Sequence, residues 1–454
     1  MVKGIAWSAY LAFHLLGQSR LPFLPAGEIR RRQSRRVERM AHYAYRHVPY
    51  YRDAMLRRGI RPETIQHVED LARLPILEND DVRRDPEYFL SRAVDRSRCV
   101  GLLSSGSCGT PKTIWHDPAA LFQNAAHGER ERSMMTRALG GWCGYRELVI
   151  VSPVGPSQRE VQEFVRDHGW FPKRMRIQRK YLFLTDSPAK NLGLINEFQP
   201  DLLYSYGSYL EMLFAYIRQT GAAWCRPKAV LYTSDHLSTA TRTWLVSECG
   251  IPVFTVYGAV EALKIGFGCD QHRGIHLNCD LYPLRILDKR GLDAEPGQAG
   301  EVIVSNLVNR ASVLLNFRMG DLASYAAEAC PCGRTLPLLS FPVGRVDEIL
   351  ELPDGSHVHP ITMHDICLGH PGIVGYQARQ QAPSAFRFSL VAAPQADRDD
   401  VRRYVLERFQ VRLGAVATAE VRFVQELERT PAGKTPAVIS LTRPFPPSAM
   451  EEQC

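Results

Sequence analysis

A run of hydroxyl and glycine residues closed by a lysine occupies residues 104–112, with the sequence SSGSCGTPK. Such a segment can offer backbone N–H groups, hydroxyl donors and one positive charge to phosphate oxygens. It differs from the P-loop of Ras-like nucleotide sites, because Lys112 is neither preceded by Gly nor followed by Ser or Thr. The sequence predicts a phosphate-binding loop here, with an ordinary surface loop as the alternative. The residues expected to meet phosphate are Ser104, Ser105, Gly106, Ser107, Gly109, Thr110 and Lys112.

Four further short motifs follow this loop in a fixed order. They are YGAVE at 257–261, FRMGD at 317–321, VGRVD at 343–347 and RTPAGK at 429–434. In this order and spacing the five stretches resemble the adenylate-forming superfamily of acyl-CoA synthetases, aryl-acid ligases and luciferases, over roughly residues 40–440. The segments HVPYYR at 47–52, GIH at 274–276 and CPCGR at 330–334 make the chain most similar to the phenylacetate–CoA ligase and capsule-biosynthesis branch.

This resemblance implies a reaction, a fold and a set of cofactors. In the reaction a carboxylate attacks the α-phosphorus of ATP, giving an acyl-adenylate and pyrophosphate. Because two anions must meet, positive charge and positioning are expected to dominate catalysis. The implied cofactors are ATP and Mg²⁺, with coenzyme A as one candidate acceptor. The implied fold is α/β, with a large N-terminal α/β domain containing parallel strands and a small mobile C-terminal α+β domain.

The resemblance also assigns the nucleotide-binding residues. Tyr257 and Gly258 are expected beside the adenine, and Asp321 is expected to accept hydrogen bonds from both ribose hydroxyls. Ser234 and Asp235 follow a predicted strand near the adenine, where the family usually has a Gly/Ala-Glu pair.

Four residues are expected to act on the phosphates or on the domain movement. Glu261 is the expected Mg²⁺ ligand. Arg345 is expected to reinforce the ribose or phosphate contact, and Lys434 to reach the α-phosphate and the carboxylate from the small domain. Asp347 is the expected hinge between the two half-reactions.

Besides Ser234 and Asp235, three positions depart from the family pattern, and none of these departures removes Lys434, Asp321 or Glu261. Cys108 stands where Thr is usual in the phosphate loop, Asn316 where a basic residue is common, and Glu348 where a second Asp follows the arginine. Activity is therefore expected, with an altered substrate as one consequence. A non-catalytic binding descendant in polysaccharide biosynthesis is the alternative that Cys108 favours.

The acid pocket implied by the resemblance lies between residues 204–209 and the residues after Tyr257. Aromatic walls there favour an aromatic acid, and Lys264 could contact a carboxylate or a phenolate of that acid. The acceptor stays open between the thiol of coenzyme A, an amine and a carrier protein, and nitrite-dependent diazotisation of an arylamine is a further alternative. The expected pocket residues are Tyr206, Gly207, Tyr209, Ala262 and Lys264.

Three cysteines and one histidine lie on or beside tight turns. Cys330 and Cys332 form a C-x-C on a Pro-Gly turn, and Cys269 and His276 flank a glycine turn about sixty residues earlier. Two such pairs suit a closed tetrahedral Zn²⁺ site, which is structural because no position is left open. Reduced cysteines in a loop are the alternative. His272 could replace His276, and Cys279 is a further thiol nearby.

The coarse pattern predicts alternating strands and helices from about residue 145. Apolar β-rich runs at 148–151, 202–206, 229–233, 253–257 and 301–305 are separated in several places by helix-like stretches such as 209–218 and 239–249. Strands separated by helices pair in parallel and place ligands near the strand ends. The expected divisions are 1–60 as a basic helical segment packed on the large domain, 61–344 as the large domain, 345–442 as the lid domain and 443–454 as a loose tail.

Composition excludes several classes of protein. The 454 residues are 45% hydrophobic and 23% charged, which excludes intrinsic disorder and collagen-like chains. No run of 18 apolar residues is present, and eleven scattered cysteines argue for a reducing cytoplasm.

The net charge of +8 arises at the N-terminus, since residues 1–60 carry +9. Apolar residues at helical spacing from Val37 to Val48 predict a docked amphipathic helix with a solvated basic face. A weak membrane-surface contact helped by residues 5–16 is the alternative, and no nucleic-acid partner is expected. A homodimer is a separate possibility for the whole chain.

Overall fold

The computed structural model describes most of the chain. The described residues are 2–104, 112–141, 143–153, 156–235, 237–288, 290–340, 344–345, 350–354, 357–358, 360–367, 370, 372–393, 395–428 and 436–440. Within these ranges, no helix combines the length and the apolar character needed to cross a bilayer.

A central eight-stranded sheet has the order β13-β9-β8-β7-β6-β5-β3-β4. Its strands from β4 to β7 run parallel, and β8, β9 and β13 add antiparallel pairs. This confirms the predicted α/β class and the parallel pairing of the first four predicted runs. The strand bounds are β3 Arg146–Val151, β4 Gln178–Phe183, β5 Leu202–Tyr206, β6 Ala229–Thr233, β7 Val253–Ala259, β8 Leu263–Gly268, β9 Ile275–Leu277 and β13 Leu338–Leu339.

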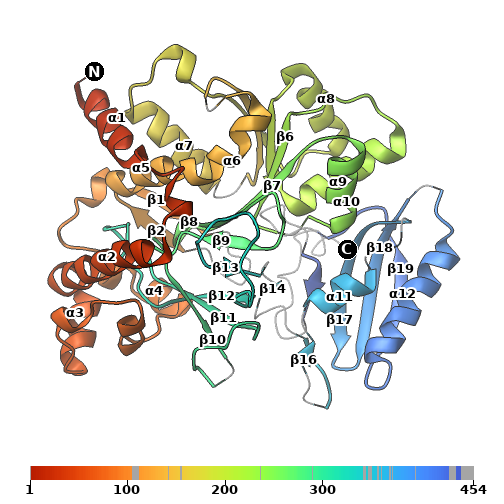
Figure 1. The fold of residues 1–454 in the computed structure, drawn as a ribbon. Helices are drawn as coiled ribbons and strands as arrows, with labels where there is room; N and C mark the ends of the chain where they lie inside the picture. The colour runs from red at the N-terminus through yellow and green to blue at the C-terminus, as the bar shows by residue number, and fades with distance from the viewer. Residues whose placement is uncertain are drawn as a thin grey trace, which may run out of the picture.

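Helices cover both faces of this sheet because its parallel strands are apolar on both sides (Figure 1). One face packs on α8 (Pro188–Phe198), α9 (Gly207–Thr220) and α10 (Thr239–Thr243), which runs on into a π-helical turn at Trp244–Glu248. The other face packs on α5 (Pro118–His127) and α6 (Glu129–Leu139). Asp117 begins α5 by accepting the N–H of Ala120 at 3.0 Å. The helix α7 (Ser157–His168) contacts α5.

A second sheet corrects one prediction. The run at 301–305 was expected among the parallel strands, but β11 (Gly300–Val304) pairs antiparallel with β10 (Leu284–Leu287) and β12 (Phe317–Ala323). No helix separates these strands among the described residues, so turns can join them as antiparallel neighbours. The strand β14 (Gly344–Arg345) completes this sheet beside β12. A separate hairpin pairs β1 (Val100–Leu103) with β2 (Thr113–His116).

The N-terminal segment forms helices that pack on the large domain. They are α1 (Val2–Leu15), α2 (Ala26–His47) and α3 (Pro49–Arg57), and α4 (Asn79–Arg84) follows beyond this segment. The predicted apolar stripe is confirmed for α2, where Val37, Met40, Ala41 and Ala44 are buried. Single-turn 3₁₀ helices occupy Leu21–Phe23, Pro62–Thr64, Glu69–Arg73, Pro86–Phe89, Arg96–Arg98 and Lys173–Met175.

The C-terminal part has its own apolar core, formed by residues between Leu350 and Val438. A four-stranded sheet of order β19-β18-β17-β20 packs on α12, and β17 contacts α9 of the large domain (Figure 1). The elements are β15 Leu350–Glu351, β16 His357–Val358, α11 Pro360–Cys367, β17 Ile373–Ala382, β18 Ala385–Ala392, α12 Arg398–Leu413, β19 Thr418–Phe423 and β20 Val438–Ile439. The exact domain boundaries stay predictions.

A buried ion pair ties α6 to the segment between the two sheets. The guanidinium of Arg130 binds both carboxylate oxygens of Asp280, at 2.7 and 2.9 Å, and donates to Gln18 Oε1 at 2.8 Å and Asn278 Oδ1 at 3.0 Å. Both charged side chains are almost completely buried. Burial alone would raise the pKa of Asp280, but Arg130 lowers it to about 2.

Removing one partner from this pair should destabilise the fold strongly. We expect Asp280→Asn to lower the free energy of unfolding at pH 7 by about 3–5 kcal/mol, measured by urea denaturation, because the variant leaves a buried arginine unpaired. The folded-state pKa lies below the unfolded value, so this stabilisation is present at neutral pH and is lost as the pH falls through about 2. The matched control Asp399→Asn removes an exposed ion pair with Arg402 and should change stability by under ~1 kcal/mol. Equal effects of the two variants would contradict the assignment.

Candidate nucleotide site and metal centre

A tight hairpin between β7 and β8 presents the first site residues. The N–H of Ala262 donates to the carbonyl oxygen of Ala259 at 3.1 Å, and Leu263 adopts a positive φ of 49°. Gly258 is required here, because a Cβ at this position would lie 2.2 Å from the carbonyl oxygen of Leu263. The sequence YGAVE therefore makes a sharp turn that places Glu261 at its tip.

Glu261 forms a buried ion pair with the predicted phosphate-loop lysine. Lys112 Nζ lies 2.6 Å from Glu261 Oε1, with 5% and 10% of the two side chains exposed. Lys112 also donates to Asn79 Oδ1 and lies over the ring of Phe317, 4.6 Å from its centroid. Two residues predicted to handle the phosphates and Mg²⁺ are thus in direct contact across 149 positions of sequence.

The two ends of the predicted phosphate loop are hydrogen-bonded to each other. The N–H of Ser104 donates to the carbonyl oxygen of Lys112 at 2.9 Å, and the N–H of Lys112 donates to Ser104 Oγ at 3.1 Å. These bonds extend the β1–β2 hairpin. Loop residues Ser105, Gly106, Ser107, Gly109 and Thr110 lie outside the described residues.

Buried polar groups hold the Glu261 turn in place. Burial lowers the pKa of His116 to about 4, so its imidazole is neutral at pH 7 and its Nε2 donates to the carbonyl oxygen of Val260 at 2.8 Å. Asn306 Nδ2 donates to the carbonyl oxygen of Glu261 at 2.8 Å. The backbone of the turn is therefore held by hydrogen bonds that do not involve the Glu261 carboxylate.

The predicted adenine and ribose residues also meet. The Tyr257 hydroxyl donates to Asp321 Oδ2 at 2.6 Å. Asp321 lies on β12, four residues after Phe317, and pairs in register with Arg345 on β14. The strand β12 therefore contributes to both the Lys112–Glu261 pair and the Tyr257–Asp321 pair. The ring of Phe317 lies beneath Lys112, and Asp321 accepts the hydrogen bond from Tyr257.

The ends of β5 and β6 bring a further group together. Asp235 accepts the N–H of Ser208 at 3.0 Å and its hydroxyl at 2.5 Å, at the start of α9, whose first residue is Gly207. Ser234 adopts a φ of 71°, which turns the chain sharply after β6. Burial raises the pKa of Tyr206 to about 12, with the charge of Asp235 adding to it. The carboxylate of Asp235 thus faces both Tyr206 and a helix N-terminus.

Lys264 forms an ion pair with the buried Glu131 of α6. The same Glu131 carboxylate adds to the effect of burial in raising the pKa of Tyr204, so these three side chains share one region. Ala262 is fully buried in the main core.

Tyr209 is not brought to this group. Its hydroxyl donates to the carbonyl oxygen of Asp186 at 3.1 Å and accepts from Asn191 Nδ2 at 2.5 Å, in the core beneath α8 and α9. Asp347 and Lys434 lie outside the described residues, and of Arg345 only the backbone is described.

The four predicted metal ligands form one cluster. The ligand atoms of Cys269, His276, Cys330 and Cys332 all lie within 4.8 Å of one another. Cys269 Sγ lies 3.6 Å from Cys330 Sγ, and Cys332 Sγ lies 3.3 Å from His276 Nε2. Zn–S bonds of about 2.3 Å and Zn–N bonds of about 2.0–2.1 Å at tetrahedral angles place such atoms about 3.6–3.8 Å apart. These two separations are near the tetrahedral values, and the four ligand atoms together form a set that could hold such an ion.

The electrostatics of the cluster suit a metal. Burial and the neighbouring Arg334 lower the pKa of His276 to about 4, which keeps the imidazole neutral as a ligand must be. Burial opposes ionisation of Cys332, but hydrogen bonds from Arg334 lower the pKa of its thiol. His272 and Cys279, the two alternative ligands, are not part of the cluster.

Comparison with known proteins decides the ancestry of the chain. The phenylacetate–coenzyme A ligase of Thermus thermophilus is 26% identical over 390 residues, which cover 79% of this chain and 80% of that enzyme. The enzyme of the same name from Pseudomonas putida is 24% identical over 346 residues, covering 71% and 70%. This chain is a distant member of the adenylate-forming superfamily, similar to phenylacetate–CoA ligases. No family model matches it.

Solved structures support the same fold. The 2-hydroxyisobutyryl-CoA ligase in its postadenylation state, in complex with R3-HIB-AMP, has a TM-score of 0.74 at 18% identity, covering 92% of this chain and 90% of that one. The same enzyme with 2-HIB-AMP and CoA in the thioesterification state has a TM-score of 0.58 at 18% identity, covering 92% and 91%. The fold of this chain is that of an acyl-CoA ligase, with a large N-terminal and a small C-terminal domain.

Three partners of the predicted site residues carry no motif of their own. Asn79 is a single residue at the start of α4, and Asn306 and Glu131 lie far from the residues they bind. Each contacts a predicted residue across at least 33 positions, so spacing alone could not reveal them. One partner did lie within a motif. The FRMGD motif carries both Asp321 and Phe317, the residue whose ring lies beneath Lys112.

The metal cluster should stabilise the large domain. We expect about one Zn per chain by elemental analysis of the purified protein. Cys330→Ser should abolish this zinc and lower the melting temperature by about 5 °C or more, at roughly 2–4 °C for each kcal/mol lost. The matched control Cys249→Ser changes a thiol outside the cluster and should alter neither value. An unchanged melting temperature for Cys330→Ser would argue against a structural metal.

Proposed function

We propose that this chain is an AMP-forming ligase that activates a carboxylic acid, aromatic in character, and transfers the acyl group to coenzyme A or an amine. The observation that carries the proposal is the joining of Lys112 to Glu261 and of Tyr257 to Asp321, both in contact with one strand. These are a cation with a metal-binding carboxylate, and an aromatic ring with a ribose-binding carboxylate. Their chemistry matches the parts of a Mg²⁺–ATP molecule.

The first half-reaction follows from these groups. The acid's carboxylate oxygen bonds to the α-phosphorus, the bond from that phosphorus to the α,β-bridging oxygen breaks, and pyrophosphate leaves with the electron pair. Mg²⁺, when bound, neutralises the phosphate oxygens. Lys112 exchanges the Glu261 carboxylate for phosphate oxygens, while Asp321 holds the ribose and Tyr257 lies against the base. Lys434 supplies a second cation to the α-phosphate.

The acid-binding part of the proposal rests on the end of β5. Tyr206 and Tyr204 carry aromatic rings there, and Lys264 with Glu131 forms an ion pair at the same region. An aromatic acid gains both ring contacts and a nearby cation. The zinc cluster lies at the end of β8 and has no open position, which supports a structural role.

The proposal includes a movement of the small domain. We infer, as the family resemblance implies, that the small domain rotates between the half-reactions with Asp347 as its hinge. The contact between β17 and α9 is then one that changes during the cycle, because α9 begins at the acid-binding end of β5.

Release of pyrophosphate tests the reaction. The protein is incubated with ATP, Mg²⁺ and a panel of aryl acids, with and without coenzyme A. We expect release that depends on the acid, followed by a thioester when coenzyme A is present. If pyrophosphate release required nitrite and an arylamine, these compounds and not a carboxylic acid would be the substrates. ATP binding with no pyrophosphate release from any acid would contradict the proposed ligase activity.

Lys434→Ala separates chemistry from binding in the same assay. The variant should lose more than tenfold in adenylation rate, which is over about 1.4 kcal/mol in the barrier, while ATP affinity stays within about threefold. The matched control Lys190→Ala removes an exposed lysine that pairs with Asp186 and should leave the rate unchanged. A loss under tenfold would count against the role of Lys434.

A further inference from the structure

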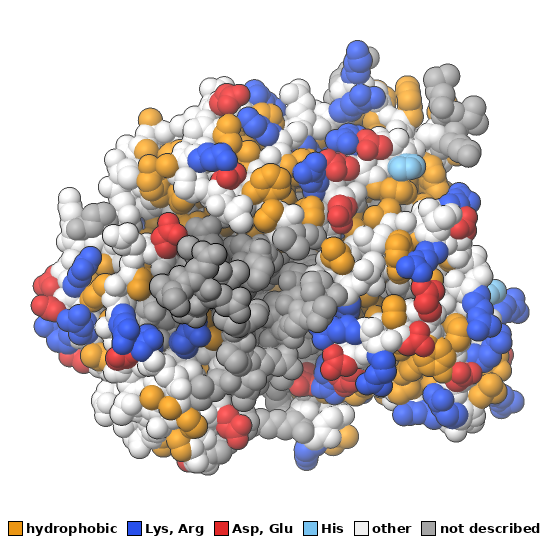
Figure 2. Space-filling view, turned by 180° about the vertical axis from the view of Figure 1, so that it is seen from behind, with side chains coloured by type: hydrophobic (Ala, Val, Ile, Leu, Met, Phe, Trp, Pro, Cys, Tyr) orange, Lys and Arg blue, Asp and Glu red, His pale blue; other side chains and the backbone are white. Residues whose placement is uncertain are grey.

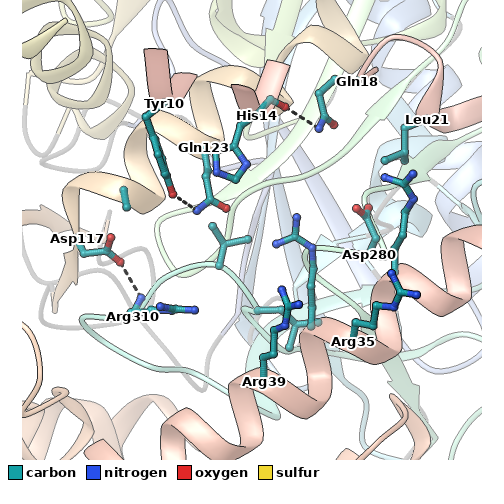
Figure 3. Close-up of a pocket in the computed structure, with 15 residues that line it drawn as sticks. Tyr10, His14, Gln18, Leu21, Arg35, Arg39, Asp117, Gln123, Asp280 and Arg310 are labelled. Atoms are coloured by element: carbon teal, nitrogen blue, oxygen red, sulfur yellow. Dashed lines mark hydrogen bonds between the residues drawn. The ribbon is translucent and has the colours of Figure 1, made fainter. Parts of the chain in front are cut away.

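A cavity of about 390 Å³ lies between α1 and α2, and its lining includes none of the predicted nucleotide-site residues (Figure 3). The close-up shows Tyr10 and His14 above it and Arg35 and Arg39 of α2 pointing into it from below, with Arg310 at one side. Its lining combines arginines with polar side chains. The remaining lining residues are Gln18, Leu21, Arg32, Arg36, Asp117, Ala119, Gln123, Asp280, Leu307 and Val308.

Four arginines of α2 face this cavity as a stripe. Arg32, Arg35, Arg36 and Arg39 are spaced so that they lie on one side of the helix, and like charges at this spacing repel. Within the described part of the chain, no carboxylate lies within ion-pair distance of Arg35, Arg36 or Arg39. Arg32 lies 3.5 Å from Glu28, and Asp280 attracts Arg36, so the protein itself compensates the positive charge of the stripe only in part.

The two acids that line the cavity are already engaged. Asp280 is bound by Arg130 on both oxygens. Asp117 accepts the N–H of Ala120 at 3.0 Å and the N–H of Arg310 at 2.8 Å. Burial lowers the pKa of Arg36, and Arg130 and Arg39 add to this effect against the attraction of Asp280. An external anion would relieve this repulsion.

The helix beside the cavity exposes an apolar face. Phe13 is 71% exposed, Leu16 77% and Ile5 51%. Ala6, Ala9 and Ala12 are also exposed and complete the same face of α1 at helical spacing. The opposite face packs on α5, where the Trp7 ring stacks on Phe122 with centroids 4.9 Å apart.

The apolar face and the cavity adjoin. The ring of Phe13 lies against that of His14, with centroids 5.3 Å apart, and His14 lines the cavity. The rear view shows Lys and Arg side chains along the edge of the molecule where α2 and α3 lie (Figure 2). An apolar helix face beside a basic surface is the combination that binds at the interface of an anionic bilayer.

We propose that α1 and the arginine stripe of α2 dock this protein on an anionic lipid membrane, with a lipid phosphate in the cavity and the apolar face of α1 in the lipid interface. A soluble anion would use the arginines but would leave Ile5, Phe13 and Leu16 without a partner. The same apolar face gives a nucleic acid no advantage. This proposal is independent of the proposed ligase activity.

Co-sedimentation with vesicles tests the docking. The full-length protein is mixed with vesicles of phosphatidylcholine alone, or with 30% phosphatidylglycerol as a chosen test composition. We expect binding only to the anionic vesicles, weakened at high salt as for any basic surface. The assay contains no ATP, so its outcome does not depend on the ligase reaction.

Two paired variants assign the binding to its residues. Arg35→Gln with Arg39→Gln should weaken vesicle binding by about tenfold or more. Its control, Arg30→Gln with Arg31→Gln, removes the same charge from the same helix but from arginines paired with Glu69 and Glu28, and should weaken binding much less. Phe13→Ser with Leu16→Ser should also lose binding, whereas Val411→Ser, at an exposed apolar residue of α12, should not.

Several results would overturn the proposal. Equal binding to neutral vesicles, or equal losses from the stripe variant and its control, would remove the role of the cavity. Binding of glycerol phosphate in calorimetry without vesicle binding would make the cavity a site for a soluble phosphate. Tighter binding to single-stranded DNA than to anionic vesicles would point to a nucleic-acid partner. Unchanged melting temperatures would exclude unfolding as the cause of any loss.

Discussion

A buried ion pair between Lys112 and Glu261 is the constraint on which the nucleotide site depends. Two charges removed from water cost several kcal/mol each unless they are paired, so each of these side chains is stabilised by an opposite charge beside it. A polyanion that takes Lys112 must therefore arrive with a cation for Glu261, and Mg²⁺–ATP supplies both. The surrounding bonds, from Asn79 to the lysine and from Asn306 and His116 to the backbone of the turn, hold the geometry through such an exchange. In the proposed function this couples nucleotide and metal binding.

Much of the site could be predicted from the sequence, for identifiable physical reasons. Glycine at 258 is forced by a close backbone approach, and the Cys/His ligands lie on tight turns, so these signals are local. Asn79, Glu131 and Asn306 could not be predicted, because a single polar residue shows no pattern until the fold brings it to its partner. The strand β11 was misassigned because an apolar run does not reveal the direction of its neighbours. Tyr209 was placed in the pocket by its position after β5, whereas the first turn of α9 directs it into the core.

The basic N-terminal segment shows how tertiary structure changes the meaning of a pattern. In sequence, the arginines of α2 read as the solvated face of an amphipathic helix, and the buried stripe of Val37, Met40 and Ala44 agrees with that interpretation. Only the position of α1 over α2 encloses Arg35, Arg36 and Arg39 in a cavity and leaves Phe13 and Leu16 exposed at its edge. Asp280 lines this cavity with both oxygens bound by Arg130, so the bond that ties α6 to the core also engages a carboxylate that could otherwise pair with the stripe.

The central claim is that Glu261 holds Mg²⁺ while Lys112 turns to the phosphates, and calorimetric titration with ATP, with and without Mg²⁺, measures it directly. For the unaltered protein we expect ATP to bind at least about tenfold more tightly with Mg²⁺, roughly 1.4 kcal/mol. Glu261→Gln keeps the shape of the side chain and frees Lys112 from its counter-charge, so this variant should bind ATP without Mg²⁺ at least as well and gain little when Mg²⁺ is added. A variant that retains the full gain from Mg²⁺ would contradict the account.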